Sequence, residues 1–418
     1  MHIKSKFLKH RITRSAFALG VLQLSNYAIP LLILPFLTRK LGVDAFGTVA
    51  IFFAAAQLVY VFTDYGFSLS ATYAVSINRD SKNYISNKIG AIFGAKFILI
   101  TIAAAVMIPL STYFQNDDIF LYSIFALIAG AAQSLQPIWL FQGTERMKLI
   151  ALYSIITKII YAALVLVLIT GPEDILLVIS SWALAQVIGL IISVHLLYRD
   201  GHSVLMPSAS DLGSEFKEGA AYFWSRIAVS IYTSASTIVV GTASTYQAAH
   251  FSVCNQMYKA GQSLTSPLNT AMFPYMAKEK DWKIFYRIFL YSIIILSLGC
   301  FAAGIISESL LGLIFGQEFR SAAPTLLIFL LISIVNYVAV TFGYSAFAAL
   351  GRTDVANKSV LAGAALHIII LAYLFVTDGV SAISVAIAIL ITEITVMVTR
   401  VYFFLRISAH QNRDGSNE

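Results

Sequence analysis

Charged residues are scarce in this chain of 418 residues. Only 12% of them are charged, whereas 58% are hydrophobic and the mean hydropathy is +0.80. An average soluble domain is about 25% charged and about 45–50% apolar. The composition therefore excludes a soluble globular fold and indicates a protein that lies in a membrane.

Cysteine clusters, metal-ligand spacings and phosphate-binding loops are also missing. Cys254 and Cys300 both fall in apolar segments, where a free thiol behaves as a small hydrophobe, so no disulfide framework is implied. His195, His250 and His367 are isolated from one another, and no metal-ligand spacing joins them. No segment fits the pattern G-x-x-x-x-G-K-[ST]. We therefore expect no ATP hydrolysis, no metal and no other cofactor.

Long apolar runs, by contrast, recur from Ser15 to Leu405. Each run can cross a hydrocarbon layer of roughly 30 Å as a helix, whereas a membrane barrel would alternate apolar and polar residues in short strands. The sequence therefore predicts an all-α polytopic membrane protein of about 12 transmembrane helices. The expected spans are 15–37, 46–74, 89–113, 119–141, 149–170, 174–197, 219–243, 246–277, 284–307, 320–350, 357–377 and 380–405.

Basic residues are distributed unevenly between the connections. Of the 28 Lys and Arg residues, 21 fall on one side of the predicted spans, and only Arg39, Lys40 and Arg320 fall on the other. Positive loops face the cytoplasm, so we expect a multi-pass protein of the bacterial inner membrane with both termini cytoplasmic. The net charge of +7 then reflects orientation and requires no nucleic-acid partner.

The longest connection, 198–218, lies on the predicted cytoplasmic side and separates six spans from six. We expect an N-terminal six-helix bundle over 1–197, a cytoplasmic inter-bundle loop over 198–218, a C-terminal six-helix bundle over 219–405 and a cytoplasmic tail over 406–418. Two bundles around a central cavity are typical of transporters. Outer connections are short, so the chain has no outer domain for hydrolysis or glycosyl transfer.

Four segments carry a recognisable set of short motifs. They are Gln23–Pro30 with Pro35–Gly42 and Phe46-Gly47, Asp64–Thr72, Pro137–Gly143 with Glu145–Lys148, and Ser230–Tyr232 with Gly241, Asn255, Pro267 and Pro274. Jointly they resemble the polysaccharide-exporting flippases of the multidrug/oligosaccharidyl-lipid/polysaccharide (MOP) superfamily, in particular the O-antigen flippases.

This resemblance implies alternating access and a lipid-linked cargo. The cargo would be an undecaprenyl-pyrophosphate-linked oligosaccharide, the O-antigen repeat unit of lipopolysaccharide biosynthesis, carried from the cytoplasmic to the periplasmic leaflet. Membrane lipid, an O-antigen polymerase and a chain-length regulator are the partners it implies. Two alternatives remain open: an ion-coupled multidrug antiporter of the same superfamily, and a polytopic O-antigen polymerase or ligase. An exporter of cationic drugs should have an acidic cavity, and an enzyme needs a larger outer loop.

Cations outnumber acids within the predicted spans. When residues that cap the span ends are counted with the connections, the four cations are Lys96, Lys158, Arg226 and Lys259, and the two acids are Asp64 and Glu393. Each buried charge costs about 2.5–3.5 kcal/mol on insertion scales, so surplus cations should face water or an anionic ligand such as a pyrophosphate. The alternative is snorkelling toward the interface, which suits Lys96 best and Arg226 next, because both lie nearer a predicted span end than Lys158 and Lys259.

Helical spacing places polar side chains on one face with three of these cations. Asn255, Lys259, Gln262 and Ser266 share a face, as do Arg226, Ser230, Thr233 and Thr237, and Ser154, Thr157, Lys158 and Tyr161. Gln23, Asn26, Tyr27 and Pro30 form a similar stripe in the first span. Interhelical hydrogen bonding is the alternative explanation. The candidate substrate-binding residues are thus Arg226, Lys259, Lys158, Asn26, Asn255 and Gln262.

The two intramembrane acids have two alternative roles. Asp64 shares a helix face with Gln57, Tyr60 and Ser68. It could bind a coupling proton or sodium ion, or it could neutralise one of the cations, and the excess of cations favours neutralisation. The same alternatives apply to Glu393.

Overall fold

The computed structural model describes residues 2–113 and 117–414, with side chains from residue 32 onward except at 221, 225, 231 and 409–414. Every regular element in these ranges is a helix, and no strand occurs in them. This confirms the predicted all-α class. The candidate residue Asn26 lies outside the described side chains.

The chain divides into two compact units. Unit 1 comprises Met1–Leu41 and Ile51–Ser230, and unit 2 comprises Gly42–Ala50 and Ile231–Glu418. Helix α1 (His2–Asp64) contributes to both, because two helices meet within it at Gly42. Gly42 has a φ of 74°, which a residue without a Cβ adopts without steric penalty.

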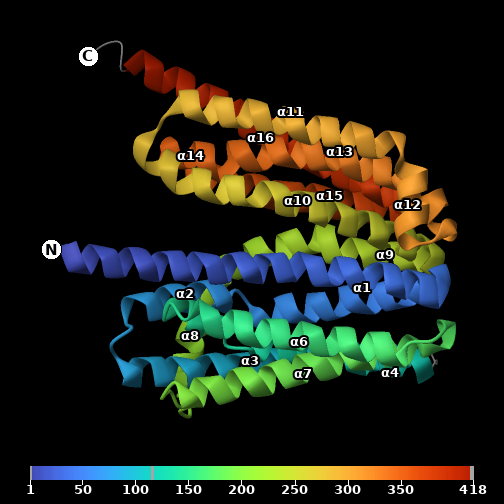
Figure 1. The fold of residues 1–418 in the computed structure, drawn as a ribbon, viewed down its shortest axis with the longest axis horizontal. Helices are drawn as coiled ribbons and strands as arrows, with labels where there is room; N and C mark the ends of the chain where they lie inside the picture. The colour runs from blue at the N-terminus through green and yellow to red at the C-terminus, as the bar shows by residue number, and fades with distance from the viewer. Residues whose placement is uncertain (1, 114–116, 415–418) are drawn as a thin grey trace. The chain divides into compact units, whose positions relative to one another are not determined.

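Unit 1 is a bundle of long helices packed side by side (Figure 1). After α1 its elements are α2 (Phe67–Ile77), α3 (Lys82–Tyr113), α4 (Asp117–Leu135), α5 (Ile138–Gly143), α6 (Met147–Leu168), the short 3-10 helix η1 (Pro172–Asp174), α7 (Ile175–Arg199) and α8 (Ala209–Ser230). Trp139, Phe67 and Tyr153 are fully buried in one of its hydrophobic core clusters. Small residues allow close packing elsewhere: a Cβ on Gly130 would lie 2.5 Å from the carbonyl oxygen of Ala56.

Unit 2 begins with the short segment Gly42–Ala50 and resumes at Ile231. Its further elements are the π-helical turn η2 (Ile231–Ala235), α9 (Ser236–Ala243), α10 (Thr245–Glu279), α11 (Trp282–Ile305), α12 (Ser307–Phe315), the 3-10 helix η3 (Gln317–Ala322), α13 (Ala323–Val340), the π-helical turn η4 (Thr341–Ser345), α14 (Ala346–Ala349), α15 (Thr353–Val376) and α16 (Ala382–Asp414). Gly47 packs directly on Thr245, since a Cβ there would meet the Thr245 carbonyl oxygen at 1.9 Å.

Nine helical segments of the described chain are long and apolar enough to cross a membrane. Eight of them coincide with expected spans, which supports a membrane protein that crosses the bilayer many times. The ninth, Leu32–Asp64, only overlaps the expected span 46–74, which is wrong as a single helix because α1 ends at Asp64 and α2 begins at Phe67. The other three expected spans are 15–37, which lies largely outside the residues searched, and 219–243 and 246–277. These are three of the four spans on which the sequence predicts polar stripes. The count of twelve stays a prediction.

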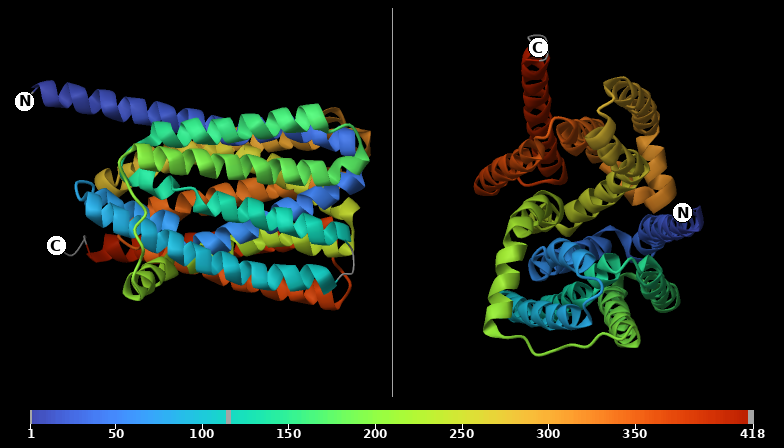
Figure 2. Two further views of the ribbon diagram at one scale, coloured as in Figure 1. Left: turned by 90° about the horizontal axis from the view of Figure 1, so that it is seen from below. Right: turned by 90° about the vertical axis from the view of Figure 1, so that its left-hand side faces the viewer.

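The predicted inter-bundle loop 198–218 is partly helical, and only 200–208 lie outside a helix. Helix α7 continues to Arg199, and α8 begins at Ala209. Helix α8 packs against α2 and α3, and its first part lies at a steep angle to the long helices of unit 1 (Figure 2). Its amphipathic sequence gives it an apolar face to bury on the bundle. The residues up to Ser230 consequently belong to unit 1, so the division falls later than the predicted boundary at 218/219.

Ion pairs and close packing hold this linker in place. Lys88 of α3 lies 2.8 Å from both Glu215 and Glu218 of α8, and both Lys88 and Glu215 are buried. A Cβ on Gly90 would lie 1.7 Å from the carbonyl oxygen of Leu205. At the start of α8, hydrogen bonds from Ser208 hold the pKa of the Asp211 carboxyl below its usual range. The predicted tail 406–418 is also partly helical, because α16 continues to Asp414.

Candidate functional site

Asp64 is the centre of a buried ion cluster in unit 1. It is the last residue of α1, directly before a turn in which Tyr65 and Gly66 adopt positive φ values of 47° and 81°. Lys96 Nζ of α3 lies 3.0 Å from its Oδ1, and Ser68 Oγ of α2 donates to the same oxygen at 2.6 Å. Arg226 Nη1 of α8 donates to Oδ2. One carboxylate therefore joins four helices.

Two cations share this single acid, so the cluster keeps one net positive charge. Lys96 is 1% exposed and also donates to the backbone oxygen of Ser134. Snorkelling is therefore wrong for Lys96, because its ammonium group is held inside the bundle. The Arg226 side chain is 24% exposed, and its guanidinium carbon lies 5.7 Å from the centre of the Tyr60 ring. Arg226 is thus the member of the cluster that a ligand can reach.

Lys158 lies on α6 of the same unit and is half-buried. Its neighbour Thr157 is buried and donates to the backbone oxygen of Tyr153 at 2.8 Å. The buried Thr157 packs against Gly189 of α7, where a Cβ would meet the Thr157 hydroxyl at 2.3 Å. Thr157 therefore packs on α7, but its hydrogen bond stays within α6, so interhelical hydrogen bonding by this stripe stays a prediction.

A second buried polar chain crosses three helices of unit 2. Gln262 of α10 donates through Nε2 to the Tyr258 hydroxyl at 2.6 Å and to Asn336 Oδ1 of α13 at 2.8 Å. Asn336 Nδ2 donates in turn to Glu393 Oε2 of α16 at 3.1 Å. Glu393 is 5% exposed. The structure thus joins two sequence candidates, Gln262 and Glu393, through an asparagine that sequence reasoning missed.

Lys259 and Asn255 occupy the same helix, α10. Asn255 is buried, and Lys259 is half-buried. Within residues 32–113 and 117–408, whose side chains are described, no hydrogen bond or ion pair links Lys259 to another residue. Unlike Lys96 and Arg226, this cation therefore has no charge partner in that part of the chain.

Arg400 is a further buried cation that the sequence analysis assigned to a cytoplasmic span end. Its guanidinium donates to Ser359 Oγ at 2.8 Å, to the Ala339 oxygen at 2.7 Å and to the Ala356 oxygen at 3.0 Å. It packs beside Gly343, where the π-helical turn departs from helical geometry. Its spacing of seven residues from Glu393 places both on one face of α16 and could have revealed it.

His367 is held between two hydroxyls. Its Nε2 lies 3.0 Å from Ser236 Oγ, and its Nδ1 lies 3.1 Å from Thr392 Oγ1. It is fully buried, and the described residues contain no group of three or more His, Cys, Asp or Glu side chains that could hold a metal ion. His367 therefore joins helices α9, α15 and α16 by hydrogen bonds.

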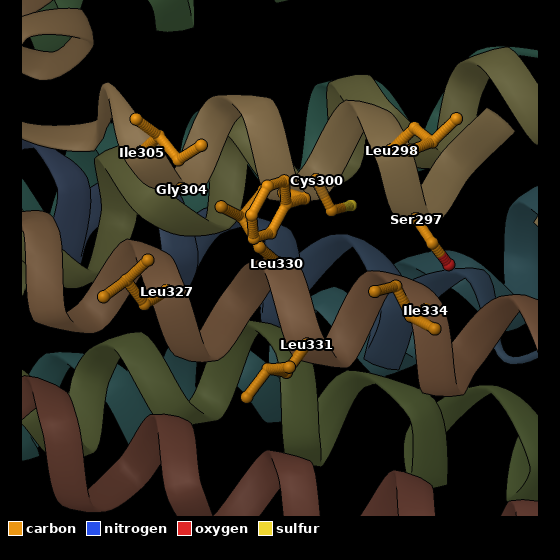
Figure 3. Close-up of a pocket in the computed structure, with 10 residues that line it drawn as sticks. Ser297, Leu298, Cys300, Gly304, Ile305, Leu327, Leu330, Leu331 and Ile334 are labelled. Carbon is orange, nitrogen blue, oxygen red and sulfur yellow. The ribbon is translucent and has the colours of Figure 1, made fainter. Parts of the chain in front are cut away.

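An apolar groove lies between α11 and α13 of unit 2 (Figure 3). Its volume is about 680 Å³, and its lining includes Leu298, Cys300, Gly304 and Leu331. None of the ten lining residues is charged. A phosphate or sugar would find almost no hydrogen-bond partner here, so this groove does not suit the polar part of a lipid-linked cargo.

Comparison with known proteins identifies relatives over most of the chain. A family model described as "Polysaccharide biosynthesis protein" matches residues 12–280. A Shigella dysenteriae protein named "Putative O-antigen transporter" is 25% identical over 378 residues, which cover 89% of this chain and 95% of the relative.

Two solved structures show the fold. An inward-facing multidrug resistance MATE family transporter of the MOP superfamily aligns with a TM-score of 0.73 at 15% identity, over 95% of this chain and 99% of its own. The lipid II flippase MurJ, in an inward closed conformation, aligns with a TM-score of 0.72 at 12% identity, over 95% and 90% of the two chains. The predicted all-α fold class is thereby confirmed.

Proposed function

We propose that this chain, which belongs to the polysaccharide biosynthesis protein family, is a flippase for an undecaprenyl-pyrophosphate-linked oligosaccharide. Nine long apolar helices in the described part of the chain, together with the transporter fold, make it a multi-pass membrane protein. In our proposal it lies in the inner membrane with both termini cytoplasmic. It moves the O-antigen repeat unit to the periplasmic leaflet by alternating access, before a polymerase and a chain-length regulator extend the glycan.

The excess of positive charge inside the helices is the observation that carries this proposal. In unit 1, Lys96 and Arg226 share one carboxylate, so one positive charge remains. In unit 2, Lys259 has no charge partner among the described side chains. An uncompensated charge costs about 2.5–3.5 kcal/mol on insertion scales, a cost that a dianionic or trianionic cargo can offset.

A pyrophosphate has the chemistry that these cations require. Its oxygens accept charge-assisted hydrogen bonds from Lys or Arg, and Arg can present a planar pair of donors. We propose that Arg226, Lys259 and Lys158 contact the pyrophosphate, and that Asn26, Asn255 and Gln262 donate to phosphate or sugar oxygens. Pro267 and Pro274 interrupt the hydrogen bonding of α10, and we propose that they help this helix to bend during the cycle.

The two rival functions receive less support. The likeness to a multidrug transporter is at 15% identity and shows the fold alone. An exporter of cationic drugs would need anionic side chains that are not already neutralised, but Asp64 is bound by two cations. For a polymerase or ligase, the relatives speak against enzymatic activity, because they are named as transporters and a flippase.

Complementation tests this proposal. A strain that lacks its own O-antigen flippase should regain surface glycan when it expresses this chain together with the enzymes that make the matching repeat unit. The same cells should show no gain in resistance to cationic drugs. Drug resistance without restored glycan, at normal membrane abundance, would favour the antiporter instead.

A further inference from the structure

Asp64 and Glu393, the buried acids that lie in the interior of predicted spans, differ in their partners. Asp64 accepts from Lys96, Arg226 and Ser68, so its ionised form is fully compensated. Glu393 accepts from one neutral amide, that of Asn336. Among the described side chains, no cation lies within ion-pair distance of Glu393. Burial without a counter-ion penalises the charged carboxylate, and binding a proton removes that penalty.

The charged and titratable groups around Glu393 do not supply the counter-ion that Asp64 has. Arg400 lies on the same helix and attracts the carboxylate, but its guanidinium is already engaged by three oxygen acceptors. Tyr232 of η2 and Tyr258 of α10 also lie within electrostatic range of the carboxylate. On α15, His367 bonds to Thr392, the residue before Glu393. Both tyrosines and this histidine bring no positive charge in their neutral forms.

The hydrogen-bonded side chains of Tyr258, Gln262 and Asn336 can bond to Glu393 whether its carboxyl group is ionised or protonated. In the observed arrangement, Asn336 donates to the carboxylate and accepts from Gln262, whose amide also donates to Tyr258. If both amides turn by 180°, Asn336 Oδ1 faces a protonated Glu393 and accepts its O–H. Asn336 then donates to Gln262, and the Tyr258 hydroxyl donates to Gln262 as well. Every hydrogen bond of the chain is kept in both states.

We infer that Glu393 is a proton-binding site of unit 2, which loads and releases a proton during transport while Asp64 stays ionised. One O–H bond forms on the Glu393 carboxylate with a proton taken from water, and the same bond breaks when the proton returns to water. That the proton is used for transport rests on the proposed function.

Infrared spectroscopy of the purified full chain tests protonation without any cargo. We expect the carbonyl stretch of a buried carboxylic acid to appear as the pH is lowered from alkaline to acidic. This band should be lost in Glu393→Gln. It should remain in Glu318→Gln, the matched control, because Glu318 is an exposed acid of the same unit. Absence of the band from the wild-type protein, or its persistence in Glu393→Gln, would overturn the assignment.

Proteoliposomes with an imposed pH gradient provide the second measurement. The gradient should accelerate cargo movement by the wild-type protein, and Glu393→Gln should lose this acceleration. Asn336→Leu, which breaks the amide chain but keeps the carboxyl, should shift the pH at which the infrared band appears. An unshifted band in Asn336→Leu would refute the role of the chain. A normal infrared titration without any cargo movement would refute the proposed function and leave the proton site standing.

Discussion

Removal of the Asp64 carboxylate should destabilise unit 1 strongly. Asp64→Asn leaves Lys96 buried at 1% exposure without its counter-ion and removes the partner of Arg226. Breaking a buried ion pair from one side costs about 3–5 kcal/mol, because the remaining charge stays buried. At about 2–4 °C per kcal/mol for a unit of about 200 residues, Tm should fall by about 6–20 °C.

The assay is thermal unfolding of the purified protein in one detergent, with a surface acid as the control. Asp354→Asn should change stability by less than about 1 kcal/mol, because the Asp354 side chain is 42% exposed and pairs with Arg352 and Lys358 at the surface. In the double variant Asp64→Asn/Lys96→Met, the buried ammonium is gone, so at least half of the lost stability should return.

Two outcomes of the unfolding experiment would contradict the role of Asp64 as counter-ion. If Asp64→Asn unfolds within about 1 °C of the wild-type protein, Lys96 and Arg226 do not depend on this acid. If the double variant is less stable than Asp64→Asn alone, the cost does not arise from an unpaired ammonium group. Either outcome would remove the basis for treating Asp64 as the counter-ion of the cluster.

Three further predictions concern Lys259, Gly47 and Lys88. At matched membrane abundance, Lys259→Arg should keep much of the glycan export, Lys259→Gln should lose most and Lys259→Glu all of it, whereas snorkelling predicts that the Gln variant is tolerated. Gly47→Ala should lower the free energy of unfolding by more than about 2 kcal/mol in a denaturation assay, because Gly47 contacts the Thr245 backbone. Gly299→Ala is the control and should not destabilise the protein, because open space surrounds Gly299. Equal stabilities of the two variants would contradict this packing. Lys88→Ala leaves Glu215 buried and unpaired, so limited proteolysis should cleave the linker at 200–208 faster than in the wild-type protein. An unchanged cleavage rate would show that the Lys88–Glu215 pair does not hold the linker against unit 1.

The helical periodicity of single spans could be predicted from the sequence. The face shared by Asp64 and Tyr60 on α1 is an example, because Arg226 donates to Asp64 and its guanidinium carbon lies 5.7 Å from the centre of the Tyr60 ring. Ser68 also bonds to Asp64, but it does so from α2, across the turn at Tyr65 and Gly66. Spacing of four residues along a helix fixes such neighbours locally. The excess of buried cations could also be seen, since it depends on composition alone.

Contacts between spans could not be predicted in the same way. The pairing of Asp64 with Lys96 and Arg226 joins residues 32 and 162 positions apart, so it depends on how the helices pack. Asn336 was missed because it carries no charge and is the one amide of α13, whose other polar side chains are Thr325, Ser333 and Tyr337. The packing of the segment 200–218 on unit 1 was missed because its charged residues suggested a solvated loop. In the structure Glu215 is buried and forms an ion pair with Lys88 of α3.

Transport of a defined lipid by the purified chain is the most direct test of the central claim. Proteoliposomes would contain a polyprenyl-pyrophosphate-linked oligosaccharide in both leaflets, and a lectin or glycosidase added outside would report the accessible fraction. Our account predicts that accessibility rises from about half to nearly all of the lipid with the wild-type protein, and stays near half with Arg226→Gln/Lys259→Gln. If wild-type proteoliposomes behave like protein-free liposomes, or if the double variant moves the lipid normally, the account is contradicted.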